Sequence, residues 1–315
     1  MAERGWRALI GGASIGGMGG RPDRRLARLR RAGAAVWAAL RDELLAWVYP
    51  WPPYCLGCGR YLPGWPPAAP ALCEECAARL GHGPGSRCPV CDRPAWLARP
   101  GDACSQCRNL GPPWVAVRSV GVYGGLLRRL ILRMKYGDEP YLAELLGRAM
   151  AGRAAAWPPA LLVVPVPMHP ERLRQRGYNQ AALLARAVAR ASRRALAEGL
   201  LVRREPGGAQ AALGAAGRRA NVAGAFVPAP RVRPGALSGQ PVLLVDDVLT
   251  TGRTLAAACA ALRQAGAGAI YGLTAAVTPL DPGRLAGPEP GLLGTGLPPA
   301  ATEPRMPFTI GGHGL

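Results

Sequence analysis

Lysine is almost missing from this 315-residue chain, although the chain is strongly basic. Its 39 lysine and arginine residues outnumber 19 acidic residues and give a net charge of +20, and Lys135 is the single lysine among them. A charge of this size ordinarily indicates nucleic acid or another polyanion as a partner. Because arginine, alanine, glycine and proline are all abundant, genome composition is the alternative source of the basicity.

Long apolar runs are also missing. No stretch reaches the eighteen or so apolar residues of a membrane-spanning helix, and the first residues lack the charged start, apolar block and cleavage site of a secretory signal. The glycine spacings of dinucleotide-binding motifs and P-loops are absent too. With 49% hydrophobic residues, the composition predicts a globular cytoplasmic protein.

Eight of the nine cysteines form four Cys-x-x-Cys pairs in a segment rich in proline and glycine, residues 50–113. This segment has too few apolar residues to fold by burial alone, and the pairs have the spacing of zinc ligands in a reducing compartment. The eight predicted metal ligands are Cys55, Cys58, Cys73, Cys76, Cys88, Cys91, Cys104 and Cys107.

Eight thiolates suffice for two structural Zn²⁺ sites with four cysteines each. Sequential pairing, the first knuckle with the second and the third with the fourth, gives a tandem zinc ribbon and is our preferred interpretation. A cross-braced pairing and an iron–sulfur cluster are the alternatives. The ninth cysteine, Cys259, lies in a predicted helix, where we expect it to fill the core.

The segment 241–254, PVLLVDDVLTTGRT, carries the clearest chemistry. Its apolar residues 242–245 predict a strand buried in a parallel sheet, which ends at Asp246 and Asp247. A Thr-Thr-Gly-Arg-Thr loop then leads into a helix predicted over 255–265. Backbone N–H groups at a helix start, a glycine and threonine hydroxyls favour a phosphate, and adjacent carboxylates suit the 2- and 3-hydroxyls of a ribose.

This stretch resembles the phosphoribosyl pyrophosphate (PRPP) signature of type I phosphoribosyltransferases. The resemblance implies that PRPP, with Mg²⁺, is the ligand of the acid pair and the loop. The predicted PRPP-binding residues are Asp246, Asp247, Thr250, Thr251, Gly252, Arg253 and Thr254. The alternative is that the acids merely end a strand and the threonines merely start a helix.

A second candidate region follows the strand predicted over 161–166. It combines a Pro-Val-Pro-Met-His-Pro turn with a basic loop that contains Arg172, Arg174 and Arg176. Guanidinium groups near a strand end favour a second phosphate, whereas His169 is either a catalytic base or an exposed turn residue. The residues predicted to lie near a pyrophosphate or in a mobile loop are Lys135, Pro167, Met168, Arg176, Gly177, Tyr178, Asn179 and Gln180.

The remaining pattern predicts an α/β domain over 114–278. Strands are predicted at 115–123 and 269–277, and helices at 124–136, 142–153 and 181–192. We expect a disordered extension over 1–23, a basic amphipathic helix over 24–49 and a disordered tail over 279–315. A glycine- and alanine-rich stretch around Gln210 is a candidate lid.

Together these motifs resemble the ComF family of bacterial DNA-uptake proteins. The residues that carry the resemblance are four cysteine knuckles, LRMKYGD, VPVPMHPERLRQRGYNQ, RRANVAGAF and VLLVDDVLTTGRT. The resemblance implies a zinc-ribbon module followed by a type I phosphoribosyltransferase-like domain, with a central parallel sheet flanked by helices. It also implies a role in handling imported single-stranded DNA beside a helicase-like partner.

Three functions fit these expectations. The first is phosphoribosyl transfer from PRPP to an unidentified acceptor, for which no residue stands out as the base. The second is a non-catalytic PRPP sensor that binds single-stranded DNA, with bases stacked on Trp51, Tyr54, Tyr61 or Trp65. The third is a scaffold whose zinc module docks a helicase-like partner.

Overall fold

The structure is a computed structural model that describes residues 53–62, 71–81, 85–95, 99, 101–204 and 224–279. The predicted extension, the basic helix 24–49, the lid around Gln210, Trp51 and Trp65 lie outside these residues. So does the predicted tail beyond residue 279.

Four parallel strands form the central sheet, in the order β1-β6-β5-β2. They are β1 (Val117–Val122), β2 (Leu162–Pro165), β5 (Val242–Leu249) and β6 (Ile270–Val277). Strands β5 and β2 are continuous apolar runs at their start because both faces of the sheet are covered. The predicted α/β class with a central parallel sheet is confirmed.

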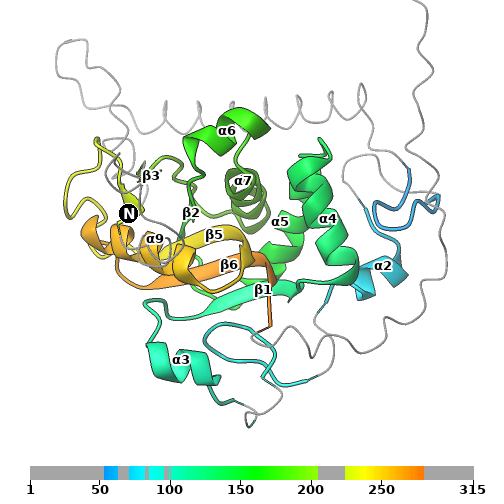
Figure 1. The fold of residues 1–315 in the computed structure, drawn as a ribbon, viewed down its shortest axis with the longest axis horizontal. Coiled ribbons are helices and arrows are strands. Elements are labelled where there is room, and N and C mark those ends of the chain that lie inside the picture. The colour runs from blue at the N-terminus through cyan, green and yellow to red at the C-terminus, as the bar shows by residue number, and fades with distance from the viewer. Residues whose placement is uncertain are drawn as a thin grey trace, which may run out of the picture.

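Helices cover both faces of this sheet (Figure 1). One face packs against α4 (Gly125–Tyr136), α5 (Leu142–Arg153) and α7 (Gln180–Ser192), and the other packs against α9 (Arg253–Gln264). Successive residues of β5 alternate between the two cores, since Leu243 and Val245 join the first and Val242 and Leu244 the second. This packing places the end of β5 between the start of α9 and the end of α4.

Shorter elements complete the described chain. They are α2 (Glu74–Ala78), α3 (Ser105–Leu110), α6 (Pro170–Arg176) and an antiparallel pair, β3 (Leu201–Arg203) with β4 (Phe226–Pro228). Within the part of the chain that the structure describes, no helix has the length and apolar character needed to cross a membrane.

Two sequence predictions about these elements are wrong. Strand β5 does not end at the acid pair but continues to Leu249, because residues 246–249 still pair with β6. The arginine-rich segment after β2 is not a loop but helix α6. Its start is fixed by Pro170 at the first helical position and by His169, whose ring Nδ1 accepts a hydrogen bond from the N–H of Glu171 at 3.3 Å. His169 is therefore a helix cap here.

The two halves of the cysteine segment pack on opposite sides of the sheet. Cys55, Cys73 and Cys76 join the core of α4, α5 and α7, whereas the four cysteines from Cys88 to Cys107 join the core of α9. In Figure 1, α2 accordingly lies beside α4, and α3 lies below β1. The cysteine segment has too few apolar residues for a core of its own, and each half packs against the apolar core of the α/β domain instead.

Candidate functional site

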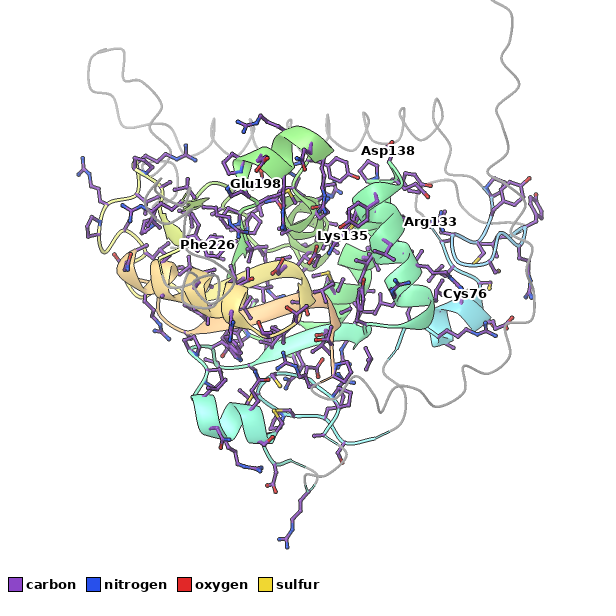
Figure 2. All side chains as sticks on the ribbon, in the orientation of Figure 1. Cys76, Arg133, Lys135, Asp138, Glu198 and Phe226 are labelled. Atoms are coloured by element: carbon purple, nitrogen blue, oxygen red, sulfur yellow. The ribbon has the colours of Figure 1, made fainter. Side chains whose placement is uncertain are left out.

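The acid pair lies at the carboxyl end of β5, where open α/β sheets bind ligands. Both carboxyl groups are partly buried, and the N–H of Asp247 donates to Asp246 Oδ1 at 2.9 Å. Lys135 reaches the pair from the last turn of α4, with its Nζ 2.6 Å from Asp247 Oδ2. Figure 2 shows Lys135 on the inner side of α4 and Asp138 just beyond the helix end. The single lysine of the chain is thus part of the candidate site.

Asp246 has an unusual proton affinity. Burial, and next the negative charge of Asp247, raise the pKa of Asp246 to about 7. The N–H of Asp247 and the charges of Lys135 and Arg203 oppose this shift without cancelling it. A carboxyl group with a pKa near neutrality can exchange a proton when a ligand arrives, which is a common property of functional sites.

The loop from Thr250 to Thr254 connects the acid pair to α9. Gly252 is the N-cap of α9 with φ 82°, a conformation that favours glycine, and a Cβ added there would lie 3.1 Å from the ring of Trp114. Thr250, Thr251, Arg253 and Thr254 are exposed. Helix α9 therefore starts at this loop, as predicted, and its first N–H groups and the three threonines follow the acid pair closely in the chain.

Two of the residues predicted near the pyrophosphate, Arg176 and Tyr178, contact the end of α4. Arg176 lies over the ring of Tyr136, 4.6 Å from its centre, and donates to the Tyr136 hydroxyl at 2.9 Å. The Tyr178 hydroxyl donates to the carbonyl of Met134 at 2.6 Å. Helix α4, which carries Lys135, is therefore tied directly to the segment 176–178.

Other residues of that region hold the backbone in place. Asn179 caps α7 through the N–H of Ala181 and donates to the carbonyl of Val166 at 3.0 Å. Gln180 is buried and accepts a hydrogen bond from Arg176, and Gly177 ends α6 with φ 75°. Pro167 and Met168 are partly buried between β2 and α6.

Arg203 is a site residue that the sequence did not indicate. It lies at the end of β3, over the ring of Phe226, and burial, with help from the charge of Arg172, lowers the pKa of its guanidinium. The charge of Asp246 opposes that shift, so Arg203 lies within electrostatic reach of the acid pair. The only sequence signal was an arginine after two apolar residues, which is typical of any short strand.

The eight predicted metal ligands form two clusters in sequential pairing, as preferred from the sequence. Cys55, Cys58, Cys73 and Cys76 make up one cluster, and Cys88, Cys91, Cys104 and Cys107 the other. In each cluster the four sulfur atoms lie within 4.8 Å of one another.

The sulfur positions fit a tetrahedral metal ion. Two measured separations are 3.8 Å, between Cys58 and Cys73, and 3.6 Å, between Cys91 and Cys104. Ligands about 2.3 Å from a tetrahedral ion stand about 3.8 Å apart. Backbone N–H groups also point at sulfur, since those of Cys73 and Cys104 donate to Cys55 and Cys88. Both clusters can therefore hold a structural metal ion.

Cys259 is fully buried in α9, and burial raises the pKa of its thiol to about 12.

Comparison with known proteins agrees with this architecture. The phosphoribosyl transferase domain model matches residues 212–278. DNA utilization protein YhgH of Salmonella typhi is 31% identical over 206 residues, which cover 63% of this chain and 87% of that protein. Competence protein F of Haemophilus influenzae is 31% identical over 169 residues, which cover 52% of this chain and 73% of that protein. Competence protein ComFC of Bacillus subtilis is 28% identical over 134 residues, which cover 38% and 52%.

The parallel sheet, the two adjacent acids near the end of β5 and the domain match define a phosphoribosyltransferase-type domain. Two four-cysteine clusters packed on that domain distinguish this chain from a bare domain of that class. Together with the relatives, these features show that the chain belongs to the ComF family, as its motifs predicted.

Proposed function

We propose that this protein binds PRPP at the carboxyl end of β5 and transfers its phosphoribosyl group during the handling of imported DNA. The observation that carries the proposal is the placement of Asp246 and Asp247 near the end of β5, two residues before the exposed threonine loop, with Lys135 paired to Asp247. A sugar phosphate has a phosphate at one end and a diol near the other, and this arrangement offers donors for the first and acceptors for the second.

Each part of the site has a distinct task in this proposal. The N–H groups and hydroxyls of residues 250–254 bind the 5-phosphate, and the carboxylates of Asp246 and Asp247 accept hydrogen bonds from the ribose hydroxyls. Lys135, Arg172 and Arg203 supply positive charge for the pyrophosphate. Mg²⁺ prefers carboxylate and phosphate oxygens, which the acid pair and the ligand provide, and it would offset the charge of the pyrophosphate.

The reaction that follows is substitution at the anomeric carbon. The bond from that carbon to pyrophosphate breaks, the acceptor atom forms the new bond, and positive charge grows on the sugar ring in the transition state. Carboxylates beside the ribose stabilise this charge, and the bound phosphate fixes the sugar in place. We assign catalysis to the positioning of the sugar and to the charges around it.

The two cysteine clusters are proposed to hold Zn²⁺, because four thiolates at tetrahedral spacing are typical of closed structural zinc sites. These sites stabilise the fold and offer no open position for a substrate. The role in DNA handling is supported by the relatives, which are called DNA utilization and competence proteins.

A second candidate function is binding of single-stranded DNA beside the first cluster. Tyr54 and Tyr61 are about half exposed and meet edge to face at 5.8 Å, with the exposed Arg60 between them in sequence. Exposed rings next to arginine suit stacked bases. Replacing both tyrosines with alanine should weaken binding of an oligonucleotide and leave PRPP binding unchanged; equal oligonucleotide affinity would remove this candidate.

The test of the main proposal is isothermal calorimetry of the zinc-loaded protein with PRPP and Mg²⁺, followed by detection of released pyrophosphate with a panel of nucleobases, nucleosides and single-stranded DNA. Binding with pyrophosphate release in the presence of one acceptor supports transfer. Binding without release under any condition supports the non-catalytic sensor instead.

A further inference from the structure

The first cysteine unit carries Cys55, Cys58, Cys73 and Cys76, and the second carries Cys88, Cys91, Cys104 and Cys107. The described parts of the two units share one local fold. In both, the first cysteine N–H donates to the carbonyl five residues later, Cys55 to Arg60 at 2.8 Å and Cys88 to Arg93 at 2.9 Å. In both, the third cysteine donates its N–H to the first sulfur and begins a short helix. The equivalent positions are Gly59 and Asp92, Arg60 and Arg93, and Glu75 and Gln106.

The equivalent arginines have opposite environments. The side chain of Arg60 is 64% exposed and pairs with Glu75 at 3.4 Å. Arg93 is only 2% exposed. Its Nε donates to the carbonyl of Thr278 at 3.0 Å, and its Nη2 donates to the carbonyl of Thr250, the first residue of the candidate phosphate loop. The second unit thus reaches the loop, which is 157 residues away in the chain.

Gln106, the equivalent of Glu75, also contacts the loop. Gln106 accepts from Arg93 Nη1 at 2.8 Å and donates its own amide to the carbonyl of Thr251 at 3.3 Å. An ionised glutamate at this position has no hydrogen to donate. The next loop residue, Gly252, lies against the ring of Trp114, whose Nε1 donates to the carbonyl of Val90 in the same unit.

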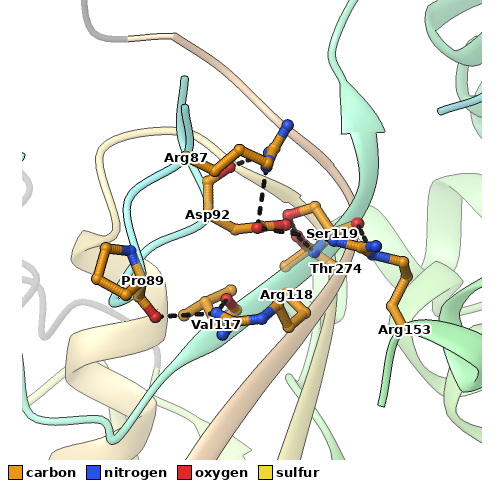
Figure 3. A network of polar contacts seen from close by, with 8 residues as sticks. All are labelled: Arg87, Pro89, Asp92, Val117, Arg118, Ser119, Arg153 and Thr274. Carbon is orange, nitrogen blue, oxygen red and sulfur yellow. Dashed lines mark hydrogen bonds and ion pairs between the residues drawn. The ribbon is translucent and has the colours of Figure 1, made fainter. Parts of the chain in front are cut away.

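Asp92 fastens this unit to the sheet (Figure 3). Its carboxylate accepts from the N–H of Ser119 in β1 at 2.7 Å and from Arg87 Nε at 3.0 Å. Asp92 has φ 62° where the equivalent Gly59 has φ 75°, a conformation that is costly for a residue with a Cβ. The carboxylate at this position anchors the unit on β1.

We propose that the second cysteine unit positions the phosphate loop, through Arg93 and Gln106, so that metal binding at Cys88–Cys107 and sugar-phosphate binding at residues 250–254 strengthen each other. The inference rests on the proposed function. Loss of the metal releases the knuckle that carries Arg93, and loss of Arg93 leaves the carbonyls of Thr250 and Thr278 without this partly buried donor. Because the linkage is thermodynamic, the sugar phosphate must in turn retain the metal.

The first unit provides matched controls. We would compare Arg93→Met with Arg60→Met, and Gln106→Glu with Glu75→Gln. The measurements are hydrogen exchange of the amides of residues 250–254, calorimetric affinity for ribose 5-phosphate, and zinc content per chain. We expect the two variants of the second unit to speed exchange in the loop and to weaken ribose 5-phosphate binding about tenfold or more. The variants of the first unit should stay within about twofold of the parent protein.

The reverse effect, of the sugar phosphate on metal binding, gives a second experiment. With a chelator present, ribose 5-phosphate should slow the loss of one zinc ion per chain, and the Gln106→Glu variant should lose this protection. If Arg93→Met does not fold, Gln106→Glu, which changes a partly exposed side chain, decides the question. Unchanged loop exchange and unchanged affinity in Gln106→Glu would overturn the inference while the proposed function stands. A parent protein that binds neither ribose 5-phosphate nor PRPP would overturn the proposed function, and loop exchange would still test the positioning role.

Discussion

Lys135 Nζ lies 2.6 Å from Asp247 Oδ2, so the last turn of α4 neutralises one acid of the pair at the end of β5. Both side chains are less than one-fifth exposed, 17% for the lysine and 19% for the aspartate. A charge pair with this little exposure is screened less by solvent than a surface pair. The pair therefore links α4 to the proposed ribose site and offers a cation where a ligand would bring its own charges.

Replacing Lys135 with methionine should weaken PRPP binding about tenfold or more, because two carboxylates would then lack their nearest cation and the pyrophosphate would lack one of its partners. Calorimetry measures this. Arg129→Met, an exposed position on the same helix, is the control and should leave affinity unchanged. Equal affinities for the two variants would contradict the role of Lys135.

The raised pKa of Asp246 predicts that the folding stability of the protein depends on pH. Its ordinary value is 3.8 and its value in the folded protein is about 7, so between these pH values the folded chain holds a proton that the unfolded chain has lost. Stability due to this group therefore falls as the pH rises from about 4 to 7 and stays low above 7.

The variant Asp246→Asn has no carboxyl group at this position, so it should not lose this stability as the pH rises. At pH 8 the variant should be more stable than the parent protein by at least about 1 kcal/mol, and near pH 4 the two should be alike. Denaturant titration at both pH values measures the difference. The same variant should lose PRPP binding. A parent protein that is the more stable of the two at pH 8 would show that Asp246 is not held in a costly charged state.

Gly252 should not tolerate a side chain. Its φ of 82° strains alanine, and a Cβ there would lie 3.1 Å from Trp114, so Gly252→Ala should cost about 1 kcal/mol or more and reduce ribose 5-phosphate affinity. Gly152→Ala is the matched control, since that glycine lies in α5 and a Cβ there meets nothing within 4 Å. Thermal unfolding and calorimetry of both variants test this. Equal stability and equal ribose 5-phosphate affinity of the two variants would contradict this prediction.

Metal content tests the pairing of the cysteines. The protein should contain two zinc ions per chain, and Cys58→Ser, at the exposed ligand of the first cluster, should lower the content to about one, because three thiolates hold zinc far less tightly than four. Elemental analysis measures this. A loss of both ions from this single change would indicate ligands shared between the clusters, contrary to the sequential grouping.

The parts of the fold that depend on local pattern were predictable. Apolar runs marked β2, β5 and β6, the helix over 142–153 has the predicted bounds, and the order of strand, acids, threonine loop and helix located the candidate site. The cysteine spacing indicated the preferred pairing. These features rest on periodicity, capping and ligand spacing, which neighbouring residues determine.

The parts that depend on contacts between distant residues were not predictable. That Arg203 faces Asp246, and that Arg93 is buried beneath Thr250, follows from how β3 and the second cysteine unit pack on the sheet. Arg60 and Arg93 each stand two residues after the second cysteine of a knuckle, yet only packing makes one exposed and the other buried. Helix α6 was missed although Pro170 and His169 carried a start signal, because its arginines suggested a loop.

The most direct test of the central claim is calorimetry with PRPP and Mg²⁺ on three zinc-loaded proteins: the parent, the double variant Asp246→Asn with Asp247→Asn, and Asp102→Asn, which changes an exposed aspartate of the second cysteine unit. The account predicts that the parent and Asp102→Asn bind PRPP alike, whereas the double variant binds at least about a hundredfold more weakly, since several charge-assisted hydrogen bonds are lost. Equal PRPP affinity for all three proteins would contradict it.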